Sequence, residues 1–346
     1  MKLGLLLRYH GEVGGPDMDL VLEAERLGYD SVWSGESYGT DSVTPTTWVL
    51  SRTKTIKAGT GIMQMSARTP AMTAMTALTL QAMSNNRFLL GIGPSGPQVI
   101  EGWHGLSYGK PLARTKEYAT ILRKVFAREG GLEQDSEHYQ IPYKGPGTTG
   151  LGKPLKCILK PIAPIKLYTA AIAPAGLRMA GEVADGVQPI FMSPEKADLI
   201  SAPVLEGMAA AGRPRSLENF DITPFVRVAM GPDLQKCRDT IRGEMALYIG
   251  GMGARSKNFY NDYAKRLGYE DAAVKIQDAF LAGKRNDAMA AVPEKFIDET
   301  ALVGPPDRIK ARVKEWKAAS KGNTIGSMLL GGADVAALRV IAEAAG

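Results

Sequence analysis

The chain has 346 residues, and its 42 Lys and Arg against 36 Asp and Glu give a formal net charge of +6 at pH 7. With 45% hydrophobic and 23% charged residues, the composition is that of a globular protein and excludes a disordered chain. Cysteine occurs only at Cys157 and Cys237, so we expect no disulfide framework and no metal site. No apolar run reaches the roughly 18 residues of a membrane helix, and the N-terminal run is too short for a signal peptide. We therefore expect a cytoplasmic protein with no membrane partner.

Short β-rich runs alternate with longer segments of helical spacing, a pattern typical of a parallel sheet. In the first half of the chain it predicts strands over 3–8, 29–33, 55–63 and 87–92. Helices are predicted over 17–27, 46–52, 70–83 and 112–128. The third of these carries Met72, Met75 and Met83 at helical spacing, and we expect them to pack between the helix and the sheet.

A Gly/Pro-rich stretch over 132–164 interrupts this pattern and is predicted to leave the sheet without forming a second domain. Strands over 165–171, 186–191 and 221–230 then alternate with helices over 174–183, 194–211 and 232–248. A second interruption, 250–304, has helical spacing throughout, and a strand over 324–330 and a helix over 334–345 follow. Eight such units predict one domain over 1–346, an α/β fold of the (β/α)8 TIM-barrel type with two insertions. A doubly wound open sheet is the alternative.

In a TIM barrel, the chemistry lies in the loops after the strands. The connections therefore supply candidate residues before any motif is considered. They are Tyr9, His10, Glu36, Ser37, Tyr38, Gln64, residues 94–104, 171–176 and 188–192, Gly331 and Gly332.

Two motif matches lack the context that they need. Residues 91–96 read GxGxxG, but glycines and a proline delay the next helix, and the next twenty residues bring Arg114 and Lys116 in place of an acidic residue at a strand end, so a Rossmann site is not predicted. Close approach of the backbone to a ligand is the remaining reason for these glycines. Residues 35–39 read GESYG, which matches the nucleophile elbow of serine hydrolases. Because the later histidines, His104 and His138, lie in the first half of the chain, hydrolysis stays a remote alternative.

Four stretches together resemble the luciferase-like monooxygenase superfamily, in its coenzyme F420-dependent branch, and most of all the methylenetetrahydromethanopterin reductases. They are LGYDSVWSGESYGTD, the region beginning IKAGTGIMQMSARTP, IKLYTAAIAPAGLRMAGEVADGVQPIF, and ALVGPPDRIKARVKEW. The resemblance implies a luciferase-like barrel, a homodimer, and hydride transfer between the deazaflavin C5 and a small organic substrate. An FMN-dependent monooxygenase that uses oxygen and a partner flavin reductase is the alternative, and a non-catalytic coenzyme-binding protein is a further one.

The resemblance also implies roles for particular residues. A non-prolyl cis peptide would map to Gly61 and Ile62, as a bulge behind the coenzyme ring. The helix start near 174 offers backbone amides that suit the coenzyme phosphodiester. The coenzyme-binding residues expected in this way are Glu36, Gly61, Ile62, Gln64, Gly93, Pro94, Ser95, Gly96, Ala171, Ala173, Ala175 and Gly176.

Relatives commonly carry an Asp-His pair after the second strand, where this chain has Glu36 and Ser37. Glu36 is therefore the first candidate for proton transfer, His104 the second and His10 the third. The predicted substrate pocket consists of Tyr9, Tyr38, Trp103, Gln188 and Phe191, and Trp33 is a further candidate for its wall. Residues 141–181 hold six basic and no acidic side chains, which favours a channel for the polyglutamate tail of the coenzyme. Thin aromatic interleaving argues against a nucleic-acid partner.

Overall fold

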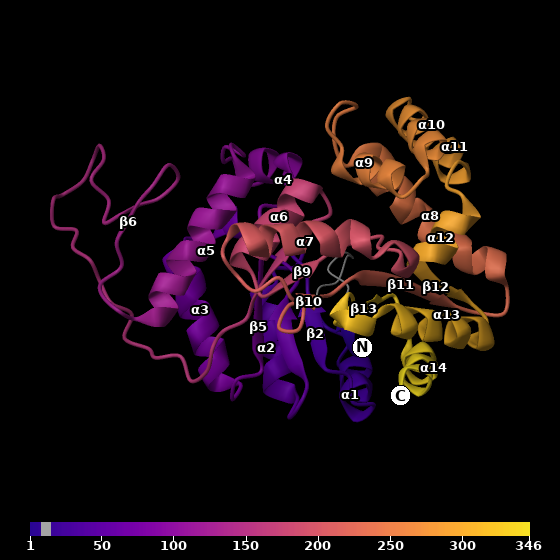
Figure 1. Ribbon diagram of the computed structural model, residues 1–346, viewed down its shortest axis with the longest axis horizontal. Helices are drawn as coiled ribbons and strands as arrows, with labels where there is room; N and C mark the ends of the chain where they lie inside the picture. Colours follow the sequence, from indigo (N-terminus) through magenta and orange to yellow (C-terminus); the bar gives the residue numbers. More distant parts are fainter. Residues whose placement is uncertain (8–14) are drawn as a thin grey trace.

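The computed structural model describes residues 1–7 and 15–346 and shows a curled parallel sheet surrounded by helices (Figure 1). Tyr9 and His10 lie outside the described residues. The strands neighbour one another in the order β10-β9-β8-β5-β3-β2-β1-β13-β11-β12, and a parallel bridge between Ile190 and Phe225 joins the β9 side to β11. The sheet thus closes on itself, which confirms the predicted barrel. The barrel strands are β1 (Lys2–Leu6), β2 (Ser31–Ser34), β3 (Lys57–Thr60), β5 (Phe88–Gly93), β8 (Leu167–Ala170), β9 (Gly186–Gln188), β10 (Asp221–Ile222), β11 (Phe225–Met230) and β13 (Ser327–Gly331).

Helices lie between the strands, and several begin at the residues that the sequence indicates. Asp17, Thr69 and Asp334 accept hydrogen bonds from backbone amides in the first turns of α1, α3 and α14. The helices of the barrel are α1 (Met18–Arg26), α2 (Val43–Arg52), α3 (Pro70–Met83), α4 (Pro97–Gly102), α5 (Pro111–Ala127), α6 (Pro174–Val183), α7 (Asp198–Ala210), α8 (Leu234–Gly251), α13 (Pro306–Ala319) and α14 (Val335–Ala345).

The two insertions leave the barrel at different places (Figure 1). Residues 132–164 form an arm that projects to the left in Figure 1 and contains the antiparallel pair β6 (Gln134–Asp135) and β7 (Gln140–Ile141). The second insertion is helical, as predicted, over α9 (Phe259–Arg266), α10 (Glu270–Leu281), α11 (Arg285–Ala290) and α12 (Glu294–Thr300). Its last four residues are instead a strand, β12 (Ala301–Gly304), which pairs in parallel with β11. The prediction of helix there was wrong, because periodicity cannot distinguish a strand of so few apolar residues from a piece of helix.

The side chains of α3 correct another prediction. Met72, Met75 and Met83 are 53%, 51% and 73% exposed and do not pack between α3 and the barrel. The buried face of α3 consists mainly of smaller residues, among them Thr73, Ala74, Ala77 and Leu78. Because α3 is apolar on nearly all sides, its sequence does not reveal which face is buried.

The barrel interior is filled by one layer of large side chains, above which glycines lie beside Gln188 and Arg227. Leu6, Trp33, Leu89, Tyr168 and Leu329 form a buried cluster in which the Trp33 and Tyr168 rings meet edge to face at 4.9 Å. Two residues farther along β5 and β13, the inward positions are Gly91 and Gly331. The mouth of the barrel, at the C-terminal strand ends, therefore has glycine on these strands.

Candidate active site at the barrel mouth

A β-bulge lies where β3 gives way to β4 (Met63–Gln64). Gly59 pairs with Leu89 and Met63 pairs with Ile92, so four steps along one strand face three along the other. The peptide bond between Gly61 and Ile62 in this bulge is cis, which confirms the prediction.

Glycines on β5 allow the bulge to lie close to that strand. A Cβ atom at Gly91 would lie 2.1 Å from the Thr60 backbone oxygen, and one at Gly93 would lie 2.9 Å from Ile62 Cδ1. The Thr60 hydroxyl replaces ladder hydrogen bonds, since Oγ1 accepts from the Gly91 amide at 3.0 Å and donates to the Gly91 oxygen at 2.7 Å. The bulge is thus fixed against β5 and presents main chain to the barrel mouth.

Glu36, in the loop after β2, joins three segments of the site. Its carboxylate accepts from the Ser42 amide at 2.9 Å, the Ser42 hydroxyl at 2.8 Å, the Gln64 amide at 3.2 Å and Arg68 Nη1 at 2.6 Å. The side chain is 8% exposed. A carboxylate with four donors is suited to holding the β2 and β4 loops together, and its role in proton transfer remains a prediction. Arg68 was not predicted as a site residue, because it has no motif of its own.

His104 is connected to the bulge through Gln64. Gln64 Nε2 donates to the Ser37 backbone oxygen at 2.8 Å, which turns Gln64 Oε1 toward His104 Nε2 at 2.6 Å. The Ser37 backbone oxygen and Gln64 Oε1 can only accept hydrogen bonds. The network therefore places a proton on His104 Nε2. In the neutral ring, Nδ1 is then the nitrogen that can accept a proton.

The predicted phosphate loop lies at the start of α6. Ala173 precedes the helix without a side-chain cap, and Ala171 packs so closely on the first turn that a Cβ at Gly176 would lie 3.1 Å from Ala171 Cβ. Arg266 on α9 donates from Nη2 to the Ile172 oxygen at 2.8 Å. A positive charge from the second insertion thus adjoins this loop, a feature that the sequence analysis missed because the two segments are 94 residues apart.

The other predicted loop, Pro94, Ser95 and Gly96, connects β5 to α4. Ser95 has a left-handed φ of 58°, and Tyr108 donates to its backbone oxygen at 3.2 Å. Of the predicted pocket residues, Gln188 and Phe191 are buried, and Phe191 meets the Tyr248 ring edge to face at 5.7 Å.

Tyr38 and Trp103 are instead mostly exposed, in the loops after β2 and α4. Their part in a substrate pocket remains a prediction. Ser37 does not lie on a nucleophile elbow, because β2 ends at Ser34 and α2 begins only at Val43. The described residues therefore offer no support for serine hydrolysis.

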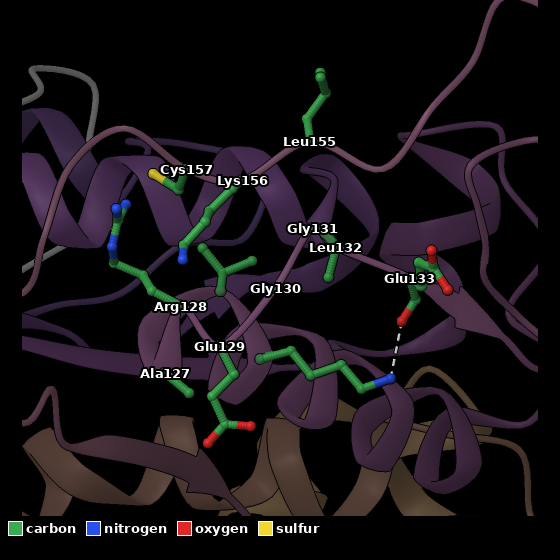
Figure 2. Close-up of a pocket in the computed structure, with 12 residues that line it drawn as sticks. Ala127, Arg128, Glu129, Gly130, Gly131, Leu132, Glu133, Leu155, Lys156 and Cys157 are labelled. Atoms are coloured by element: carbon green, nitrogen blue, oxygen red, sulfur yellow. Dashed lines mark hydrogen bonds between the residues drawn. The ribbon is translucent and has the colours of Figure 1, made fainter.

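A small hollow of about 260 Å³ lies elsewhere, between the end of α5 and residues 155–157 (Figure 2). Arg128, Lys156 and Cys157 line it, and Lys124 Nζ donates to the Glu133 oxygen at 2.8 Å beside it. Because α5 follows β5 and returns toward the N-terminal strand ends, this hollow is remote from the barrel mouth. Lys156 lines this hollow, and its part in a coenzyme channel remains a prediction.

Within residues 1–7 and 15–346, no group of three or more His, Cys, Asp or Glu side chains is arranged to hold a metal ion. No helix in the same part of the chain has the length and apolar character needed to span a bilayer.

Comparison with known proteins gives the class to which this (β/α)8 barrel belongs. The family model for luciferase-like monooxygenases matches residues 5–321, so the chain belongs to this family. A putative coenzyme F420-dependent oxidoreductase of Mycobacterium tuberculosis is 41% identical over 321 residues, 92% of each chain. The 5,10-methylenetetrahydromethanopterin reductase of Archaeoglobus fulgidus is 27% identical over 315 residues, 89% of this chain and 88% of that protein.

Solved structures share the fold. The coenzyme F420-dependent tetrahydromethanopterin reductase of Methanopyrus kandleri superimposes with a TM-score of 0.78 at 20% identity, covering 99% of this chain and 97% of that one. An F420-dependent secondary alcohol dehydrogenase, solved with an F420-acetone adduct, gives a TM-score of 0.75 at 16% identity, covering 100% and 99% of the two chains. At this identity the likeness concerns the fold.

Proposed function

We propose that this protein is a coenzyme F420-dependent oxidoreductase that transfers a hydride between the deazaflavin and a small organic substrate. The observation that carries the proposal is the bulge at Gly61 and Ile62, where main chain rather than side chains faces the mouth. A bound deazaflavin would supply or accept a hydride at its C5. The 41% identical relative, described as a putative F420-dependent oxidoreductase, supports this coenzyme over FMN.

The residues present fit such a coenzyme at both of its ends. Gly61 carries no side chain, so a flat ring would approach the main chain of the bulge beside the Gln188 carboxamide, whereas Thr60 fills the space at Gly91 and Arg227 fills that at Gly331. The start of α6, next to Arg266, offers backbone amides and a positive charge to a phosphate group. Burial lowers the pKa of Arg266 from its ordinary value, yet that value is so high that the side chain stays charged at neutral pH.

We assign the proton transfer that accompanies hydride transfer to His104. Its Nε2 is committed to Gln64, which leaves Nδ1 to take a proton from the substrate or, when protonated, to return one. Glu36 is a weaker candidate because its carboxylate is already occupied by Ser42, Gln64 and Arg68. In this proposal, Gln64 is a positioning residue and His104 a catalytic one.

The coenzyme is tested by titrating the purified protein with F420 and, separately, with FMN. We expect F420 to bind, and its oxidised absorbance to change when a panel of carbonyl, imine, alkene and alcohol compounds is added with the matching redox form. Tight FMN binding without F420 binding would overturn the proposal in favour of a monooxygenase. F420 binding with no turnover across the panel would favour a non-catalytic coenzyme-binding protein.

The role of His104 is tested with His104→Ala. We expect turnover to fall by about 10²–10⁴-fold, the usual contribution of general acid-base catalysis, with little change in F420 affinity. His138→Ala is the matched control, since His138 lies in the arm and its Nδ1 bonds Glu117 on α5. Gln64→Leu should shift the pH profile of turnover, and Gln64→Glu should partly restore it. Equal turnover in His104→Ala and His138→Ala would refute the assignment.

Exposed apolar side chains on α2 and α3 support a homodimer. Trp48, Met72, Met75 and Met83 lie outside the barrel, where a second copy could cover them. Light scattering on the purified protein, with Met75→Lys as the perturbed variant, tests this; a monomer at all concentrations would refute it. We further propose a cytoplasmic location, in keeping with the free state of Cys157 and Cys237.

A further inference from the structure

Gln188, the last residue of β9, has a buried carboxamide to which none of the described residues is hydrogen bonded. The residue is 3% exposed, and neither Oε1 nor Nε2 has a hydrogen-bond partner among the described residues. A buried polar group in this state has lost its bonds to water without replacement, which is unfavourable and uncommon. By contrast, the buried amides of Gln64 and Gln81 are both hydrogen bonded. Within the described part of the chain, the Gln188 carboxamide is therefore left available to a ligand.

The carboxamide of Gln188 lies directly against the bulge. A Cβ atom at Gly61 would lie 3.3 Å from Oε1 and 3.4 Å from Nε2, and one at Gly91 would lie 3.6 Å from Oε1. Both polar atoms thus occupy space that two glycines leave free. A flat ligand placed on the bulge would meet this carboxamide at its edge.

The polar groups of Trp33 and Tyr168, in the layer of large side chains, are already engaged. Trp33 Nε1 donates to Ser31 Oγ at 2.9 Å, and the Tyr168 hydroxyl donates to Asp221 Oδ2 at 3.2 Å. The layer of large side chains therefore does not satisfy Gln188. Of the inward positions at the mouth, Gly61, Gly91 and Gly331 carry no side chain at all.

We propose that Gln188 recognises the imide edge of the coenzyme ring, with Nε2 donating to a ring carbonyl oxygen and Oε1 accepting from the ring N–H. A carboxamide offers one donor group and one acceptor side by side, which complements an N–H flanked by a carbonyl. The coenzyme named here rests on the proposed function, but the imide edge is common to deazaflavins and flavins. The assignment of Gln188 is therefore separable from the choice between F420 and FMN.

The experiment compares wild type with Gln188→Leu, which keeps the volume and removes both polar atoms. We expect the Kd for F420, measured by the fluorescence of the coenzyme, to rise about tenfold or more, as for the loss of a site's hydrogen bonds to its ligand. The melting temperature of the coenzyme-free protein should stay the same or rise, because an unsatisfied buried group has been removed. The increase in melting temperature on adding coenzyme should shrink.

Gln277→Leu is the matched control. Gln277 on α10 is 5% exposed, and its Nε2 also lacks a partner within the described part of the chain. This variant should behave like Gln188→Leu without coenzyme but bind F420 like wild type. If Gln188→Leu folds poorly, Gln188→Met, which is unbranched like glutamine, takes its place.

A Kd for Gln188→Leu within twofold of wild type would overturn the inference. An unchanged Kd together with a raised KM for the substrate would also overturn it, because Gln188 would then bind the substrate and not the coenzyme. If wild type binds FMN and not F420, the proposed function fails, and the same variants titrated with FMN still decide the role of Gln188.

Discussion

Replacing Glu36 by Gln distinguishes a structural carboxylate from a catalytic one. In wild type the carboxylate accepts from two donors on Ser42, the Gln64 amide and Arg68 Nη1, with 8% of the side chain exposed. A glutamine can keep one oxygen facing Arg68 and Gln64, but its NH2 group then faces the Ser42 amide, which is also a donor. The substitution therefore removes the charge opposite Arg68 and at least one hydrogen bond.

The magnitude follows from these contacts. A hydrogen bond to a charged group contributes about 1.5–3 kcal/mol and a neutral one about 1 kcal/mol. Because Arg68 is 21% exposed and partly hydrated, we take the lower part of this range. Glu36→Gln should then lower the free energy of unfolding by about 2–3 kcal/mol.

Urea denaturation of wild type, Glu36→Gln, Arg68→Met and the double variant measures both the loss and the coupling. We expect a coupling energy of about 1–2 kcal/mol between the two side chains, as for residues in one hydrogen-bonded pair. Turnover per folded molecule should fall far less than in His104→Ala. Unchanged stability together with a hundredfold loss of turnover would refute this reasoning and make Glu36 the catalytic acid or base.

Two further predictions concern the packing of the barrel. Gly91→Ala should destabilise the protein by about 3 kcal/mol, since its Cβ would lie 2.1 Å from the Thr60 oxygen. Gly102→Ala, with open space around it, should be neutral or slightly stabilising. Equal stability of the two variants in urea would contradict this prediction. Burial raises the pKa of Asp221, whose carboxylate accepts from Tyr168 and Ser327. A raised folded-state pKa contributes stability below the unfolded value of about 4, and this is lost as pH rises through the folded-state pKa. Asp221→Asn should therefore be more stable than wild type at pH 8, and by less at pH 5; urea curves that show a loss at both pH values would disprove it.

Much of the fold follows from local patterns. The alternation of β-rich runs and helical segments predicts the barrel, and capping residues such as Asp17, Thr69 and Asp334 mark where helices begin. Local patterns were insufficient where a strand and a helix are compatible with the same run of apolar residues. The four residues of β12 were taken as helix, and the predicted strand over 221–230 is split into β10 and β11 at Pro224, which has no N–H to donate.

The sequence by itself predicted the alternating strands and helices from residues close together along the chain, and its resemblance to a known family placed the bulge at Gly61 and Ile62. Only the tertiary structure decided which side chains meet. Arg68 is 32 residues from Glu36, and His104 is 40 from Gln64. Gln188 comes to lie against Gly61 only when β9 and β3 join the same barrel. Hydrogen bonds and packing between such distant residues are set by the closure of the sheet, and no local period of the sequence encodes them.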